Sequence, residues 1–200
     1  MFKLQFGKKN VPLFIITLII LIYVIVTSID GLKYFFKKDG PVDLGEAVSI
    51  NMDAFSALKD GDFVQIKGIT SIHGGALNKG FLSEKHIIFY LAGSNKFVIT
   101  EKADDSEKFG GPQFRTIQGK VRSFKTDKHA AKMRDFFAKS FLLEMDEDGF
   151  LIESGVIPGK DYSPVMIFGI VVVLLIVSVG LFIRSLKTDT EITENDEDDI

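Results

Sequence analysis

The fold of this chain is decided by two stretches without a charged residue, NVPLFIITLIILIYVIVTSI (Asn10–Ile29) and YSPVMIFGIVVVLLIVSVGLFI (Tyr162–Ile183). At a rise of 1.5 Å per residue, about 20 helical residues cross the roughly 30 Å hydrocarbon core of a bilayer. The region between them is too small to bury two such helices on all sides. We therefore predict an integral membrane protein with transmembrane helices at residues 11–29 and 162–183.

The first stretch has a second interpretation, because an apolar segment near an N-terminus can be a cleaved signal peptide. Lys3, Lys8 and Lys9 suit both interpretations, and Val26 and Ser28 are small enough to precede a cleavage point. The apolar part, residues 11–26, is longer than the roughly 7–15 residues of a signal core. We favour an uncleaved anchor.

Basic residues predict the orientation, because lysine and arginine are retained on the cytoplasmic side of a membrane. Residues 1–10 carry three lysines and no acid, and Arg184 and Lys187 follow the second stretch. We therefore expect residues 1–10 and 184–200 in the cytoplasm and residues 30–161 outside it. That placement is periplasmic for a bacterial inner membrane, and intermembrane or lumenal for an organelle.

The C-terminal tail has seven acidic and no basic residues from Thr188 to Ile200. Such a composition buries too little apolar surface to order a chain, so we expect a disordered acidic tail. A spacer that favours solubility and a docking tail for a cytoplasmic partner are both consistent with it.

The composition of residues 30–161 argues against several classes of function. The chain has no cysteine, which excludes disulfides, thiolate catalysis and cysteine zinc sites. This segment carries 19 basic and 20 acidic residues, whereas a nucleic-acid-binding surface needs a basic excess. We expect the lipid bilayer and other membrane proteins as partners, and no nucleic acid.

The middle segment has the pattern of a small β-rich domain. Asn51–Leu58 is a short predicted helix with Asn51 as its N-cap, and His73–Gly80 is a predicted glycine-rich loop. Gly93-Ser94-Asn95 is a predicted hairpin turn. Gly68 and Gly119 interrupt strands and predict bulges or bends. Five stretches have the residue pattern of strands: Phe63–Thr70, His86–Leu91, Phe97–Thr100, Phe114–Phe124 and Phe150–Ile157.

The best predicted soluble helix is Asp127–Phe141, with Asp127 as its N-cap. Its apolar stripe includes Ala130, Met133 and Phe137 at helical spacing, and we expect it to cover the sheet. The alternative is that the stripe docks on a partner's membrane segment. The predicted fold class is thus membrane α+β: two transmembrane helices flanking an antiparallel, OB-like sheet of about five strands with one helix.

One acidic segment has two interpretations, a calcium-binding loop and a solvated turn. Glu144, Asp146, Asp148 and Gly149 follow the spacing of a calcium-binding loop. The twelfth position, however, is Gly155 where that loop needs a bidentate acid. We expect a solvated acidic turn, with a calcium site as the alternative.

No other motif assigns chemistry. The histidines at positions 73, 86 and 129 lie in different elements and lack metal-ligand spacing. Ser56 and Lys59 match a Ser-x-x-Lys pattern without its companion motifs. The two apolar stretches contain no Asp, Glu, Lys, Arg or His, so they show no machinery for ion or proton transport. We predict no catalytic, cofactor-binding or metal-binding residue, no cofactor, and a protein that is not an enzyme.

The layout resembles the Surf-type cytochrome oxidase assembly proteins, which also have two spans flanking an external β-rich domain. Asp62–Gly68 (DFVQIKG) and Ile117–Arg122 (IQGKVR) carry the local resemblance in their strand ends. The resemblance implies an assembly role and transfers no site residue.

We therefore expect a non-enzymatic, membrane-anchored accessory, scaffold or assembly-factor protein. Four residues separate Gly159 from Pro164, so we expect the external domain to lie close to the bilayer. The alternative function is a binding module for a lipid or small ligand at the bilayer surface. It would use the loop at His73–Gly80 and the aromatic residues that follow the first span.

Overall fold

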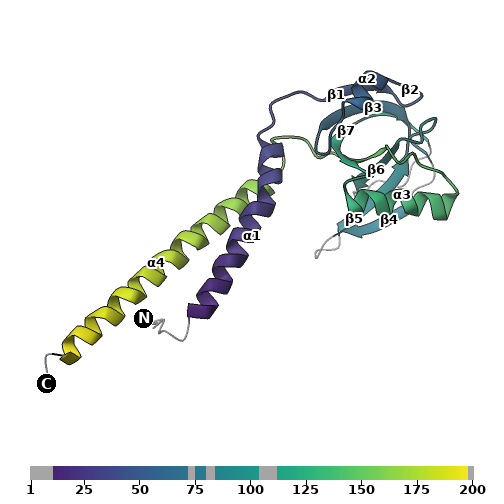
Figure 1. Ribbon diagram of the computed structural model, residues 1–200. Coiled ribbons are helices and arrows are strands. Elements are labelled where there is room, and N and C mark those ends of the chain that lie inside the picture. The colour runs from purple at the N-terminus through teal and green to yellow at the C-terminus, as the bar shows by residue number, and fades with distance from the viewer. Residues whose placement is uncertain (1–10, 72–74, 80–83, 104–111, 198–200) are drawn as a thin grey trace. The chain divides into compact units, whose positions relative to one another are not determined.

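The computed structural model describes residues 11–71, 75–79, 84–103 and 112–197 (Figure 1). The chain divides into a helical unit, made of the two long helices, and a β domain from Lys37 to Lys160. The elements in chain order are α1 (Val11–Phe35), β1 (Val42–Glu46), β2 (Ser49–Ile50), α2 (Met52–Ser56), β3 (Phe63–Ile69), β4 (Gly75–Lys79), β5 (Glu84–Tyr90), β6 (Phe97–Lys102), β7 (Phe114–Ser123), α3 (Lys128–Phe141), β8 (Phe150–Ser154) and α4 (Ser163–Glu197).

The helical unit is an antiparallel pair of helices (Figure 1). The ring of Phe14 stacks on that of Phe182, with 4.2 Å between their centroids. At the other end of the pair, the ring of Phe35 lies 5.1 Å from that of Tyr162. Because the start of α1 meets the distal part of α4 and its end meets the start of α4, the helices contact each other along the whole apolar length.

Both helices are long and apolar enough to cross a membrane, over Phe14–Phe35 and Ser163–Arg184. The prediction of two such helices is confirmed at the level of length and composition. The cytoplasmic placement of both termini stays a prediction.

The tail differs from the expectation of disorder. α4 runs without interruption from Ser163 to Glu197, so the acidic segment is helical to that residue. A helix that is already formed by the apolar stretch needs no new nucleus, and each further residue adds one hydrogen bond. The amino-acid composition of the tail by itself does not reflect this contribution of the preceding helix.

The sheet of the β domain is mixed, and the predicted antiparallel, OB-like arrangement of about five strands is wrong. The described residues form one sheet of eight strands in the order β2-β1-β3-β7-β8-β6-β5-β4. β6 pairs with β8 in parallel, as does β1 with β3, and the other neighbours are antiparallel. A parallel pair joins segments that are distant in the chain, so strand patterns alone do not reveal it.

The sheet curls until the end of β3 meets the end of β5, although these strands are not neighbours in the strand order. The N–H of Ala92, after β5, donates to the carbonyl of Ile69 at 2.8 Å, and the N–H of Ser71 donates to the carbonyl of Tyr90 at 2.9 Å. A bridge between Thr70 and Leu91 lies between these bonds. The end of β3 is therefore hydrogen-bonded to β7 on one side and to the end of β5 on the other.

Two apolar cores lie on opposite faces of the central strands. Phe97 and Ile99 of β6 point into the curled sheet, where Phe55 of α2 covers them. Val98 of β6 points outward and packs with Phe137 of α3. Burial on both faces explains why β6 and β8 read as continuous apolar runs without alternation.

Several local predictions are confirmed. Asn51 caps α2 through a 3.2 Å bond from the N–H of Ala54, and Asp127 caps α3. The five predicted strands correspond to β3, β5, β6, β7 and β8. Helix α3 covers the sheet with its predicted apolar stripe, of which Ala130 and Phe137 are fully buried.

Other predictions need correction. The predicted loop His73–Gly80 contains β4, which forms a hairpin with β5, and the short strands β1 and β2 had no clear pattern. Gly68 and Gly119 mark no bulge, because β3 and β7 pair in unbroken register. A Cβ at Gly119 would overlap the carbonyl of Glu153 in β8, so this glycine permits a close backbone approach.

Candidate functional site

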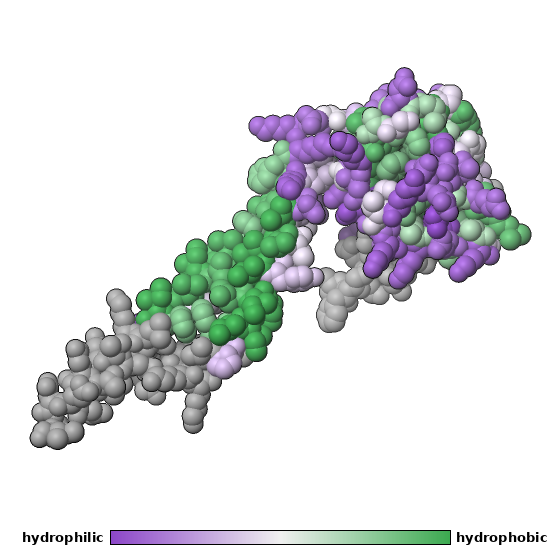
Figure 2. Space-filling view, in the orientation of Figure 1, coloured by the Kyte–Doolittle hydropathy of each residue, from purple (hydrophilic) through white to green (hydrophobic). Residues whose placement is uncertain are grey.

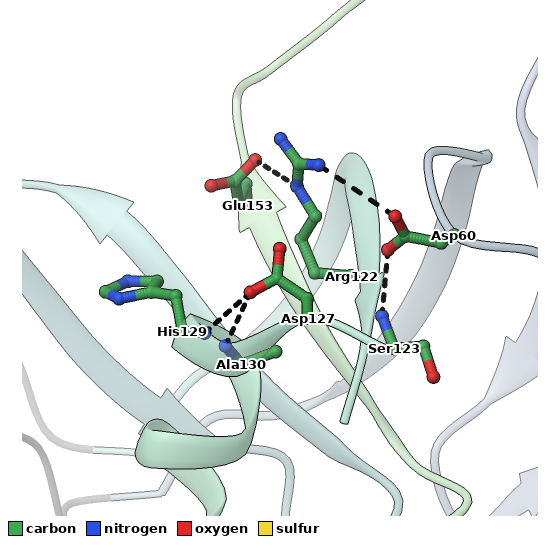
Figure 3. Close-up of polar contacts among 7 residues, drawn as sticks. All are labelled: Asp60, Arg122, Ser123, Asp127, His129, Ala130 and Glu153. Carbon is green, nitrogen blue, oxygen red and sulfur yellow. Dashed lines mark hydrogen bonds and ion pairs between the residues drawn. The ribbon is translucent and has the colours of Figure 1, made fainter. Parts of the chain in front are cut away.

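A group of charged side chains lies where β7, β8 and the turn before β3 meet (Figure 3). The Nε of Arg122 lies 3.4 Å from the Oε2 of Glu153, and its Nη1 lies 4.0 Å from the Oδ2 of Asp60. The other oxygen of Asp60 accepts the N–H of Ser123 at 3.0 Å. We call Asp60, Arg122, Asp127 and Glu153 the Arg122 cluster.

Asp127 and His129 resemble a catalytic pair in sequence but do not form one. The Oδ1 of Asp127 accepts the backbone N–H groups of His129 and Ala130, at 2.7 and 3.0 Å, and the imidazole of His129 points away (Figure 3). Partial burial raises the pKa of Asp127, but these two N–H donors and the charge of Arg122 outweigh it and lower the pKa overall. The carboxylate therefore acts as an ionised helix cap.

The Arg122 cluster joins elements and presents no reactive group. Each of its carboxylates accepts a hydrogen bond or faces the guanidinium of Arg122. Lys120, which is 7% exposed, lies opposite Glu153 in the β7–β8 register and adds a positive charge. These contacts connect the sheet to the turn before β3 and to the start of α3.

The acidic turn before β8 does not have the geometry of a calcium loop. Asp146 accepts a 2.7 Å bond from Lys96, which lowers the pKa of its carboxyl, and Asp148 pairs with Lys125. Glu153, two positions before the twelfth position of such a loop, faces Arg122. Lysine ammonium groups thus occupy the oxygens that a cation would need.

The remaining sequence candidates are separate from one another. His86 lies on β5, His129 begins α3, and His73 is outside the described residues. Ser56 and Lys59 are both exposed, and the N–H of Lys59 donates to Asp62 in a turn. Among the described residues, no three His, Cys, Asp or Glu side chains are grouped to hold a metal ion.

Exposed apolar side chains are the second kind of candidate site, and sequence reasoning missed them on the β domain. Ile69 and Phe114 are cross-strand partners at the ends of β3 and β7, and both are exposed. Leu142, directly after α3, is 90% exposed. Its positive φ depends on tertiary context, so no local pattern predicts it.

The helical unit presents the largest apolar surface (Figure 2). The pairing of α1 and α4 buries Leu21 and Val171 but leaves most large apolar side chains outside. Six of the exposed ones are Ile16, Ile19, Tyr23, Ile167, Ile170 and Ile176. An exposed apolar surface of this extent is typical of proteins that contact a membrane or another protein there.

Comparisons with protein families, curated proteins and solved structures gave no match to this chain.

Proposed function

We propose that this protein is a non-enzymatic accessory, scaffold or assembly-factor subunit, anchored in a membrane by α1 and α4 and acting through its β domain. The supporting observation is the apolar exterior of the antiparallel helix pair, which has no Asp, Glu, Lys, Arg or His over residues 11–29 and 162–183. Such a pair suits lipid on its outside and offers no charged pathway inside.

The β domain supports a binding role better than a catalytic one. Its carboxylates in the Arg122 cluster, and Asp146 and Asp148 in the acidic turn, are bonded to structural donors, so these groups are not placed as a general acid or base. Its exposed apolar side chains, among them Phe114 and Leu142, are the type that protein and lipid contacts use.

Co-purification tests the proposal. We expect the full chain, extracted in mild detergent, to carry at least one membrane-protein partner in fixed stoichiometry. A matched variant, Phe114→Ser with Ile69→Ser, removes apolar exposure without touching the core and should lower the yield of a partner that binds there. A chain that stays a lone monomer after chemical cross-linking in native membranes would contradict the proposal.

The second candidate function is a binding module for a lipid or small ligand at the bilayer surface. His73 and Gly74 lie outside the described residues, and Gly75–Lys79 forms a strand. The exposed end of α3 favours a lipid contact of another kind.

A further inference from the structure

Leu142 has two unfavourable properties at once. It terminates α3 with φ 53° and ψ 34°, the left-handed conformation that helix ends usually assign to glycine or asparagine. Its side chain is also 90% exposed, more than any other large apolar residue among those described. A strained conformation that displays an apolar side chain to solvent indicates a contact that water does not supply.

The Leu142 side chain follows a group of packed aromatic residues at the end of α3. Phe141 packs on Phe137 and Phe136, with ring centroids 5.4 and 5.8 Å apart, and Phe137 is fully buried against the sheet. The aromatic group fixes the end of α3. Leu142 is therefore held outward by the fold and does not depend on a loose loop for its exposure.

A basic stripe runs along the exposed face of α3 toward Leu142. Lys128, Lys132 and Lys139 are exposed and follow one another at helical spacings of four and seven residues. None of them pairs with a carboxylate in the part of the chain that the structure describes. The one acid between them, Asp135, is bonded to Arg134 at 2.9 Å.

We propose that the exposed face of α3 is a lipid-contact surface, in which Leu142 enters the headgroup region of an anionic bilayer and Lys132 and Lys139 contact lipid phosphates. This surface is called the α3 lipid face. Lysines beside an apolar tip match the layers of an anionic membrane, where phosphates lie above hydrocarbon. A protein partner with an acidic rim is the competing occupant.

We favour a membrane as the occupant of the α3 lipid face because short connections join the proposed membrane helices to the β domain. Six residues separate the end of α1 from β1, and eight separate β8 from α4. Short connections give the tethered surface a high effective concentration at the bilayer, so weak individual contacts suffice. The inference rests on the proposed anchoring by α1 and α4, and deepens it by adding a peripheral contact.

Because the chain has no cysteine, a single introduced cysteine can be labelled specifically. The full chain carrying Ser140→Cys, next to Leu142, is labelled with a small fluorophore and reconstituted into nanodiscs of phosphatidylcholine with phosphatidylglycerol. Acyl-brominated lipids then quench a label that reaches the hydrocarbon boundary. A label at Thr116→Cys, an exposed position on β7, is the remote control.

We expect the label at position 140 to be quenched strongly and the label at 116 weakly. Leu142→Gly should abolish the difference, and glycine is tolerated there because it accepts a positive φ. Lys132→Glu with Lys139→Glu should weaken docking by about fivefold for each lysine in anionic nanodiscs. Met52→Ala, at an exposed apolar residue of α2, should leave the quenching unchanged.

The outcomes separate this inference from the proposed function. If the chain does not reconstitute with a protease-protected helix pair, the anchoring itself is wrong. If it reconstitutes and position 140 is quenched no more than position 116, the α3 lipid face is wrong and a protein partner becomes the occupant. Quenching that survives Leu142→Gly would also overturn the assignment.

Discussion

At the scale of single residues, the β domain depends on positions where the backbone comes unusually close to a neighbour. At Gly119, in the middle of β7, the carbonyl of Glu153 in β8 occupies the space of a side chain. The obstacle is backbone, which cannot rotate away as a flexible side chain does. The glycine is therefore a packing requirement of the β7–β8 pair.

Gly119→Ala is expected to destabilise the β domain by about 3 kcal/mol, at the upper end for overpacking, because a strand must shift. Thermal unfolding of the full chain in mild detergent, followed by circular dichroism, measures this. Gly40→Ala is the matched control, since its Cβ would meet no atom within 4 Å. Equal stability of the two variants would contradict the close approach.

Asp127→Ala is expected to cost about 1 kcal/mol at neutral pH, because it removes the cap of α3. Asp127→Asn keeps an acceptor but loses the charge, so it should cost less. The native pKa of Asp127 is lowered, so the charge stabilises the fold above the ordinary pKa of an aspartate and stops doing so as pH falls through the native value. The stability difference between Asp127→Asn and the parent chain should therefore shrink below about pH 4. A difference that grows on acidification would contradict this account.

Leu142→Gly is expected to raise the stability of the β domain by about 1 kcal/mol, because glycine carries no penalty in the left-handed conformation. Chemical unfolding compares the variant with the parent chain. Leu142→Ala is the control: it removes the same exposed side chain but keeps the Cβ and the strain, so it should give little gain. A destabilised glycine variant would show that Leu142 packs in the fold.

At the scale of elements, the antiparallel pairing of α1 and α4 makes one helical unit from two segments that are distant in the chain. The pairing is close near one end, where a Cβ at Gly31 would lie 3.1 Å from the Cβ of Pro164. Small residues at such points let helix backbones approach in lipid, where no hydrophobic force holds helices together.

Cross-linking tests this pairing directly. Cysteines at Phe14 and Phe182, whose rings stack in the parent chain, should react with a short bismaleimide within one molecule. Cysteines at Phe14 and Met166 lie at opposite ends of the pair and should not. Gly31→Leu should reduce the first reaction by separating the helices. Equal reaction of both pairs would argue against a fixed antiparallel register.

At the scale of the whole molecule, the proposal that α1 and α4 each cross a membrane predicts that the N- and C-terminal segments lie on one side of it and the β domain on the other. Single cysteines at exposed Thr126 and at Thr190 distinguish the two sides in intact cells. A membrane-impermeant maleimide should label position 126 without lysis and position 190 only after lysis. The reverse pattern would invert the predicted orientation, and labelling of both before lysis would contradict two spans.

Local patterns predicted the elements whose cause is local. The caps Asn51 and Asp127, the apolar stripe of α3 and the glycine turn between β5 and β6 each depend on neighbours within a few residues. The contacts at the candidate sites, in contrast, depend on residues that are distant in the sequence. The calcium-like spacing at residues 144–149 was visible in the sequence, but its lysine partners come from Lys96 and Lys125, which the fold brings there.

The sequence by itself determined that two apolar helices enclose a β-rich segment, because length, hydropathy and the absence of charge act over one contiguous stretch at a time. Tertiary structure alone decided the parallel pairing of β6 with β8, the bridge between the ends of β3 and β5, and the outward display of Leu142. Those features depend on which surfaces remain to be buried after the elements have formed, and residues more than fifty positions apart share that burial.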